Sequence, residues 1–217
     1  LGAADTLVEA DSDAIQGLPG IANVSPGNSV RTFISSNGAR IFARIQGIST
    51  SFENIYSWNY VQGGSIENPT SESAVLGTNL AADLFGAGVN PIGQVVQLRD
   101  TNYTVIGVTD DSADDHSEVM FVPWRTLQSN LDKTNLDSIT ISVQRAGEAS
   151  SISEEIRALL RQRHGLVDPN NSEVRTGYLT QQGGVGGVPD DFTVETQAAE
   201  VLTKGLYTPA AAFALAN

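Results

Sequence analysis

Apolar residues alternate with polar ones in several short runs of the chain, the pattern of strands that bury one face. Residues 30–48 hold two such runs around Asn37-Gly38, and this pair predicts a hairpin because both residues tolerate a positive φ. A second hairpin is predicted at 94–111, with its turn at 100–102, and single strands are predicted at 21–26, 74–77, 119–124, 138–144 and 192–196. Because apolar residues recur at every second position in so many runs, sheets are expected to form much of the core.

Helical periodicity is confined to shorter stretches. Ile152, Ile156, Leu159 and Leu160 share one face of a predicted helix, and His164 lies in its last turn, where a cation complements the helix dipole. Shorter helices are predicted at 11–18, 51–58 and 78–85, with Asp11 and Thr78 as caps of the first and third, and a further one is possible from Gln197.

The order of these elements favours the α+β class, because helices and strands are interspersed without a regular β-α-β repeat. A helix–strand pair at 11–26 and a strand–helix–strand unit at 138–196 can pack as one subdomain. The prediction is therefore a discontinuous lobe of residues 1–49 and 134–217, with residues 50–133 inserted as a second, mixed α/β lobe.

Composition excludes several classes of protein. The 217 residues include 12 basic and 25 acidic ones, a net charge of -13, and nucleic-acid binding is not expected of a chain that lacks a basic cluster. The absence of cysteine excludes disulfides, thiolate zinc sites and cysteine nucleophiles. No run reaches the roughly 18 apolar residues that a membrane helix needs.

The glycine-rich stretch 74–98 raises the question of a phosphate-binding loop. A Walker loop requires Gly-Lys, which the chain lacks, and Gly86-Ala87-Gly88 follows a predicted helix, whereas a dinucleotide fingerprint precedes one. Gly86 is better interpreted as a helix C-cap, and Gly88 and Gly93 as turn residues. The nucleophile motif Gly-x-Ser-x-Gly is also absent. No catalytic residue and no cofactor are predicted.

Two other stretches leave alternatives open. The acidic segment 110–118 surrounds His116 and could hold a hard cation, but the glycine of a calcium loop is missing, and a solvated acidic loop is the preferred interpretation, so no metal is predicted. The aromatic residues between 52 and 60 would either pack a short helix on a sheet, the preferred alternative, or form a sugar- or peptide-binding platform; they are Phe52, Tyr56, Trp58 and Tyr60.

Several segments in a fixed order resemble the periplasmic core domain of MacB-type ABC transporter permeases. They are DAIQGLPGIANVSP, AVLGTNLAADLF, NPIGQVVQL, YTVIGVTDD, MFVPW, ITISV, IRALLRQRHGL and DFTVET, and they span about residues 11–196. The segment YLTQQGGVGGVPDD is longer than the resemblance leads one to expect. The resemblance implies a porter-like lobe with βαβ units and an inserted sabre-like lobe.

The resemblance also implies a function. Such a domain lies between two membrane helices of a permease in the inner (cell) membrane, on the periplasmic or extracellular side. It does not hydrolyse ATP, and it couples ATP-driven helix motion to export. The implied partners are a periplasmic adaptor (membrane fusion) protein, a second permease subunit and ABC nucleotide-binding domains. Leu1 and the apolar tail 210–217 would lie near the ends of an excised segment.

Partner contact is expected from loops, because binding residues concentrate on loops that a rigid scaffold positions. The predicted contact residues are Asn37, Gly38, Asp114, Asp115, His116, Gly184 and Gly186. Two other functions remain open at this stage: a stand-alone envelope module that binds a ligand through the aromatic residues 52–60, and a secreted hydrolase.

Overall fold

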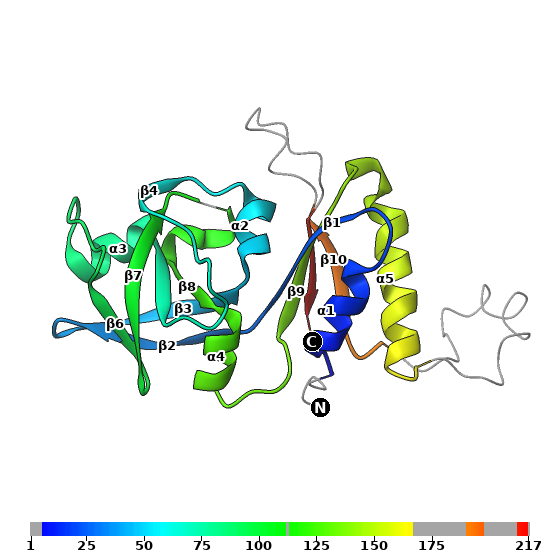
Figure 1. Cartoon of the computed structure of the whole chain (residues 1–217), viewed down its shortest axis with the longest axis horizontal. Helices are drawn as coiled ribbons and strands as arrows, with labels where there is room; N and C mark the ends of the chain where they lie inside the picture. The colour runs from blue at the N-terminus through cyan, green and yellow to red at the C-terminus, as the bar shows by residue number, and fades with distance from the viewer. Residues whose placement is uncertain (1–5, 112, 167–189, 198–211, 217) are drawn as a thin grey trace, which may run out of the picture.

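A computed structural model describes residues 6–111, 113–166, 190–197 and 212–216, which form two lobes on separate sheets (Figure 1). The smaller lobe has the strand order β1-β9-β11-β10, with every neighbouring pair antiparallel. Its elements are α1 (Glu9–Gln16), β1 (Ile21–Gly27), β9 (Ser138–Val143), α5 (Ala149–Arg163), β10 (Thr193–Gln197) and β11 (Ala212–Ala216), with a short 3₁₀ turn at Ala146–Glu148.

The core of the smaller lobe follows from two periodicities. Ile139, Ile141 and Val143 alternate along β9 and are buried. Ile152, Ile156 and Leu160 recur at helical spacing and bring α5 onto the same core, as their sequence pattern predicts. Gly165 then ends the helix at a φ of +67°.

The larger lobe contains the rest of the described chain. Its elements are β2 (Ser29–Ser36), β3 (Ala39–Ile48), α2 (Thr50–Tyr56), β4 (Tyr60–Gly63), β5 (Ser73–Gly77), α3 (Thr78–Phe85), β6 (Val95–Leu98), β7 (Thr101–Thr109), a 3₁₀ helix η1 (Ala113–Glu118), β8 (Val119–Pro123) and α4 (Trp124–Asn130). The strand order is β4-β7-β5-β8-β3-β2-β6, and β6 also pairs with β7, so the sheet closes on itself.

Closure separates an inner and an outer face of the larger sheet. The inner face carries Ile34, Ile45, Leu76 and other apolar residues that pack against α3 and α4. The outer face is covered by α2 around Phe121. Over β2 and β3 the outer face carries exposed side chains instead.

The α+β class and the two lobes agree with the sequence prediction, but the boundary at residue 49 does not. β2 and β3 lie in the larger sheet, so the chain leaves the smaller sheet at Gly27 and enters the larger one at Ser29. The alternation at 30–48 predicted both strands correctly, but it carries no information about which sheet they join. The assignment of the lobes as porter-like and sabre-like stays a prediction.

The local predictions for turns, caps and the last helix are confirmed only in part. The first hairpin turns at Asn37 and Gly38, as predicted. The second turns at Arg99 and Asp100, one residue earlier than expected. The N-caps are Val8 and Gly77 rather than Asp11 and Thr78. The possible helix from Gln197 is wrong at its first residue, which ends β10, and its remainder lies outside the described residues.

Gly38 allows a direct test of the hairpin turn. Its φ is +84° and a Cβ there would meet no atom within 4 Å, so Gly38→Ala changes backbone strain alone. We expect Gly38→Ala to lower the free energy of unfolding by about 1 kcal/mol in urea denaturation. Gly64→Ala is the control, because that position is also open and lacks a positive φ. Equal stability of the two variants would contradict the turn geometry.

Candidate functional site

The tip of the β2–β3 hairpin borders a recess of about 490 Å³. The hairpin reaches the end of the larger lobe that points away from the smaller lobe (Figure 1). The recess is lined by side chains and backbone of β2, β3, β6, β7 and the turn, namely Ser35, Ser36, Asn37, Gly38, Ala39, Arg40, Val95, Gln97 and Asn102. Two of the predicted contact residues, Asn37 and Gly38, therefore lie at a concave surface that polar and apolar atoms line in equal measure.

Hydrogen bonds hold this hairpin tip in place. Asn37 Nδ2 donates to Gln94 Oε1 at 3.2 Å, and Ser36 Oγ donates to the carbonyl oxygen of Val95 at 2.6 Å. Ser35 pairs with Gln97 across β2 and β6. The recess is thus built on a fixed backbone, which suits a surface that must keep its shape during contact.

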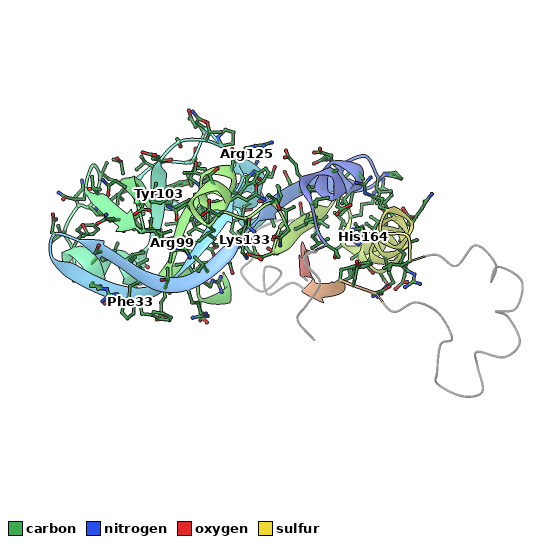
Figure 2. All side chains as sticks on the ribbon, turned by 90° about the horizontal axis from the view of Figure 1, so that it is seen from below. Phe33, Arg99, Tyr103, Arg125, Lys133 and His164 are labelled. Carbon is green, nitrogen blue, oxygen red and sulfur yellow. The ribbon has the colours of Figure 1, made fainter. Side chains whose placement is uncertain are left out.

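An aromatic pair lies on the outer face next to this recess, and it is not among the contact residues predicted from the sequence. The rings of Phe33 and Phe42 meet edge to face with centroids 5.2 Å apart, and the guanidinium carbon of Arg40 lies 4.0 Å from the centroid of Phe33. Figure 2 shows Phe33 on the outside of the larger lobe. Alternation of apolar and polar residues along β2 and β3 was the only sequence signal for this pair. It does not show which of the two alternating sets of side chains faces solvent.

The acidic segment 110–118 does not join the hairpin recess. Its residues 113–118 form η1, which packs against α3 and β5. Asp115 is exposed there, with a φ of +60°, and the side chain of Asp114 lies outside the described part. Gly184 and Gly186 also lie outside the described residues. The predicted contact residues therefore do not form one site.

His116 corrects the prediction of a contact residue. Its side chain is 2% exposed, and its Nδ1 lies 2.7 Å from Asp111 Oδ2. The same carboxylate oxygen accepts a hydrogen bond from Trp58 Nε1 at 2.6 Å. His116 is buried because the aromatic residues of α2 and β8 surround it, an arrangement that no local pattern reveals.

The aromatic residues 52–60 pack as the preferred alternative predicts. Phe52 is buried, and its ring meets Tyr56, Trp58 and Phe121 at centroid distances of 4.8–5.8 Å. These residues form the core between α2 and the outer face of the sheet, with Tyr60 at its edge. Their rings are used for packing and do not form an exposed platform.

A charged cluster ties the last turn of α5 to α1 and to the segment before β10. His164 Nε2 lies 3.1 Å from Asp11 Oδ2, its Nδ1 lies 2.8 Å from Asp191 Oδ1, and Arg163 Nε donates to Asp11 Oδ1 at 2.7 Å. Burial alone would lower the pKa of His164, but the hydrogen bonds and charges of Asp191 and Asp11 raise it above its usual value. The predicted helix-terminal cation is therefore also the centre of a buried ionic contact.

Two chain segments cross between the lobes, and one carboxylate holds them together. Asp137 Oδ2 accepts hydrogen bonds from the backbone N–H of Ser29 at 2.9 Å and from Asn28 Nδ2 at 3.2 Å, and Lys133 Nζ donates to Asp137 Oδ1 at 2.8 Å. Asn28 and Ser29 belong to the first crossing, and Lys133 and Asp137 belong to the second. The lobes are thereby fixed at the point where the chain passes between them.

Trp124 and Arg125 add a second contact between the lobes. Trp124 follows β8 of the larger sheet, yet it is buried in the hydrophobic core of the smaller lobe. The guanidinium carbon of Arg125 lies 4.5 Å from the centroid of the Trp124 ring, and its nitrogens bind the carboxylate of Glu9 in α1. We call Asn28, Ser29, Trp124, Arg125 and Asp137 the lobe joint.

The described residues hold no cluster of three or more carboxylates, histidines and cysteines that could bind a metal ion. Among the helices that the structure describes, none combines the length and the apolar composition that crossing a bilayer requires.

Comparison with solved structures defines the class of fold. The chain superposes with a TM-score of 0.66 on the extracellular domain of the noncanonic ABC-type transporter YknZ from Gram-positive bacteria, at 18% identity over 74% of this chain and 86% of that one. The periplasmic region of MacB from Actinobacillus actinomycetemcomitans also gives a TM-score of 0.66, at 20% identity over 74% and 75% of the two chains. The fold is that of extracytoplasmic domains of ABC-type transporters.

The chain belongs to the MacB-like periplasmic core domain family, whose model matches residues 2–159. Curated relatives include a probable syringafactin export ATP-binding/permease protein of Pseudomonas syringae pv. tomato, 28% identical over 76% of this chain and 26% of its own length. The macrolide export ATP-binding/permease protein MacB of Acinetobacter baylyi is 29% identical over 75% and 26%. The chain thus spans about a quarter of the length of these relatives, and it corresponds to the periplasmic region of a permease rather than to a nucleotide-binding domain.

Proposed function

We propose that this domain transmits the ATP-driven motion of membrane helices in a permease to a periplasmic adaptor protein, and so supports substrate export. ATP hydrolysis would take place on separate cytoplasmic nucleotide-binding domains, and the permease would act with a second permease subunit. Membership of the MacB-like family supports the permease, and the names of the relatives, which combine ATP-binding, permease and export, support ATP-driven export. The adaptor and the second permease subunit are proposed from the resemblance of the sequence alone.

The lobe joint is the observation that carries this proposal. A domain that transmits force must move as one body, and a chain with two separate sheets would otherwise bend at its two crossings. Asp137, in the second segment that connects the lobes, accepts hydrogen bonds from Asn28 and Ser29 in the first. Trp124 inserts into the hydrophobic core of the opposite lobe. Thr6 donates to the carbonyl oxygen of Asp191, and Ala216 ends β11, so both described ends of the chain lie in the smaller lobe. Displacement there would reach the hairpin tip through this joint.

Contact with the adaptor is proposed at the hairpin tip, at Asn37 and Gly38, with Asp115 as a separate contact point. The recess beside Asn37 and its position at the end of the larger lobe support the first of these. Gly184 and Gly186 remain proposed contacts on sequence grounds alone.

A photo-crosslinking amino acid at Asn37 tests this contact. In the full-length permease expressed with its adaptor, we expect irradiation to join the two proteins when the crosslinker replaces Asn37. The matched control is Glu155, which is exposed on α5 of the smaller lobe. Crosslinks from Glu155 with none from Asn37 would place the adaptor elsewhere and contradict the proposed contact.

The surrounding gene tests the membrane assignment independently. We expect it to encode apolar spans of about 20 residues that flank this domain. A gene without such spans would favour a stand-alone envelope module. The aromatic residues 52–60 do not support that alternative, because their rings are packed together.

A further inference from the structure

The outer face of the β2–β3 hairpin carries three rows of side chains in register. Arg31 lies opposite Arg44, Phe33 opposite Phe42, and Ser35 opposite Arg40. Alternate residues of a strand share a face, so the three rows lie side by side on the same surface. An aromatic row is thus bracketed on each side by a row that contains arginine, and the recess at the hairpin tip adjoins the Ser35–Arg40 row.

The aromatic row is exposed to a degree that packing does not explain. Phe33 is 47% and Phe42 58% exposed, and they are the only aromatic residues among the exposed large hydrophobic side chains that the structure describes. Phenylalanine and arginine are both enriched at the centres of protein interfaces, where a flat apolar ring is desolvated and a charge is paired. The Phe33–Phe42 pair therefore has the character of an unoccupied contact surface.

The charge of this face is opposite to that of the molecule. The chain contains no acidic residue between Asp13 and Glu53, although it carries 25 in total. In the part of the chain that the structure describes, neither Arg31 nor Arg40 forms an ion pair. Arg31 also lies directly opposite Arg44, and like charges in that position destabilise a hairpin. The positive charge is therefore available to a ligand.

We propose that this face binds an extended segment of a partner protein in which two acidic residues flank an apolar one. Rows of side chains on one face of a strand are about 7 Å apart, twice the rise per residue, and same-face residues of an extended peptide have the same spacing. A segment of the pattern acidic-x-apolar-x-acidic places its apolar side chain on the Phe33–Phe42 pair. Its two carboxylates then reach Arg31 at one end and Arg40, beside the recess, at the other.

This inference rests on the proposed contact of a partner at the hairpin, and it adds the chemistry of the segment that is bound. The isolated chain and a synthetic peptide test it without an adaptor or transport. Peptide binding without a crosslink at Asn37 would contradict the proposed adaptor contact and support the present inference. A crosslink at Asn37 without peptide binding would support the adaptor contact and contradict the present inference.

The test is a fluorescence anisotropy titration of this chain against a labelled peptide, GESLSEG. We expect saturable binding that Arg40→Glu or Phe42→Ser weakens by about tenfold or more, since the first removes the partner of one carboxylate and the second removes half of the aromatic pair. Matched controls are Arg145→Glu, whose side chain is 79% exposed, and Val61→Ser, 57% exposed; both should bind within about twofold of the unchanged chain. The peptides GKSLSKG and GESSSEG should bind at least about tenfold more weakly.

Three results would overturn the proposal. The first is equal affinity of GESLSEG and GESSSEG, or of the Phe42→Ser and unchanged chains, because the aromatic row would then play no part. The second is a dimer in sedimentation that Arg40→Glu dissociates, because a second copy would then occupy the face. The third is binding to vesicles of phosphatidylglycerol that Arg31→Glu abolishes while the peptide shows none, because the face would then recognise a membrane surface.

Discussion

Replacing Trp124 by alanine is expected to lower the free energy of unfolding by about 3–5 kcal/mol, the usual cost of removing a buried tryptophan. The side chain lies in the core of the smaller lobe but is borne by the larger one. Gly47 leaves space for it, because a Cβ at that position would come within 2.9 Å of the Trp124 Cα. Loss of the ring therefore opens a cavity and removes the main apolar contact across the lobe joint.

Urea denaturation followed by circular dichroism measures this effect. Phe42→Ala is the matched control, because it removes an aromatic ring that is 58% exposed and should change stability by less than about 0.5 kcal/mol. A loss below about 1 kcal/mol for Trp124→Ala would show that the joint does not depend on this residue. In the full permease, the same variant should reduce export more than it reduces the amount of folded protein.

Replacing Asp11 by asparagine is expected to cost about 3 kcal/mol. The Asp11 carboxylate is almost completely buried and binds Arg163, His164 and the backbone N–H of Val8, the N-cap of α1. Asparagine keeps the shape but removes the charge, and it leaves two cationic side chains without their shared partner. The value lies at the low end for a buried ion pair because Arg163 retains access to water.

Asp13→Asn is the control, because Asp13 lies exposed on the same helix and undergoes the same change. It should leave the free energy of unfolding within about 0.5 kcal/mol of that of the unchanged chain. Equal costs for the two variants would mean that the Asp11 cluster contributes nothing specific.

The pH dependence of the Asp11 effect follows from two opposite pKa shifts. Burial alone would raise the pKa of Asp11, but hydrogen bonds from Arg163, Val8 and His164 hold it below 3.8. The stability that the charged Asp11 adds is therefore present above pH 3.8 and is lost as pH falls through the lowered pKa. The pKa of His164 is raised above 6.5, so the contribution of the charged histidine is complete below pH 6.5 and is lost as pH rises through the raised pKa.

The difference in stability between the unchanged chain and Asp11→Asn should accordingly be greatest between about pH 4 and 6.5. It should decline partly at alkaline pH, where Arg163 remains charged, and strongly in acid. Denaturation in urea at a series of pH values measures this profile. A difference that grows steadily from pH 6 to pH 9 would contradict the His164 contact.

Local sequence signals predicted the elements that depend on neighbouring residues. Asn37-Gly38 forms the expected turn because positive φ values are a property of these residue types. The helix at 149–163 follows from its periodicity, and its sequence also shows the cationic last turn. These features need no knowledge of distant parts of the chain.

Features that depend on residues far apart in the chain were not predicted from the sequence. The segment Ala212–Ala216 is rich in alanine and shows little strand propensity, yet it lies between β9 and β10 because both edges find a partner there. His116 lies in an acidic segment that suggests exposure, but the ring cluster around Phe121 buries it. The sequence shows that Phe33 and Phe42 belong to alternating patterns in β2 and β3. Which face of these strands is exposed to solvent depends on closure of the sheet.

The class of fold, the Asn37–Gly38 hairpin, the amphipathic α5 and the absence of the motifs for nucleotide or thiol chemistry could be read from the amino-acid sequence, because each rests on residue type and short spacing. Three features required the folded chain: where the lobes divide, which cations share Asp11, and that Phe33, Phe42 and Arg40 form one exposed surface. Those outcomes depend on strand partners and packed side chains that are far apart in the chain, and a local pattern cannot encode the choice among such partners.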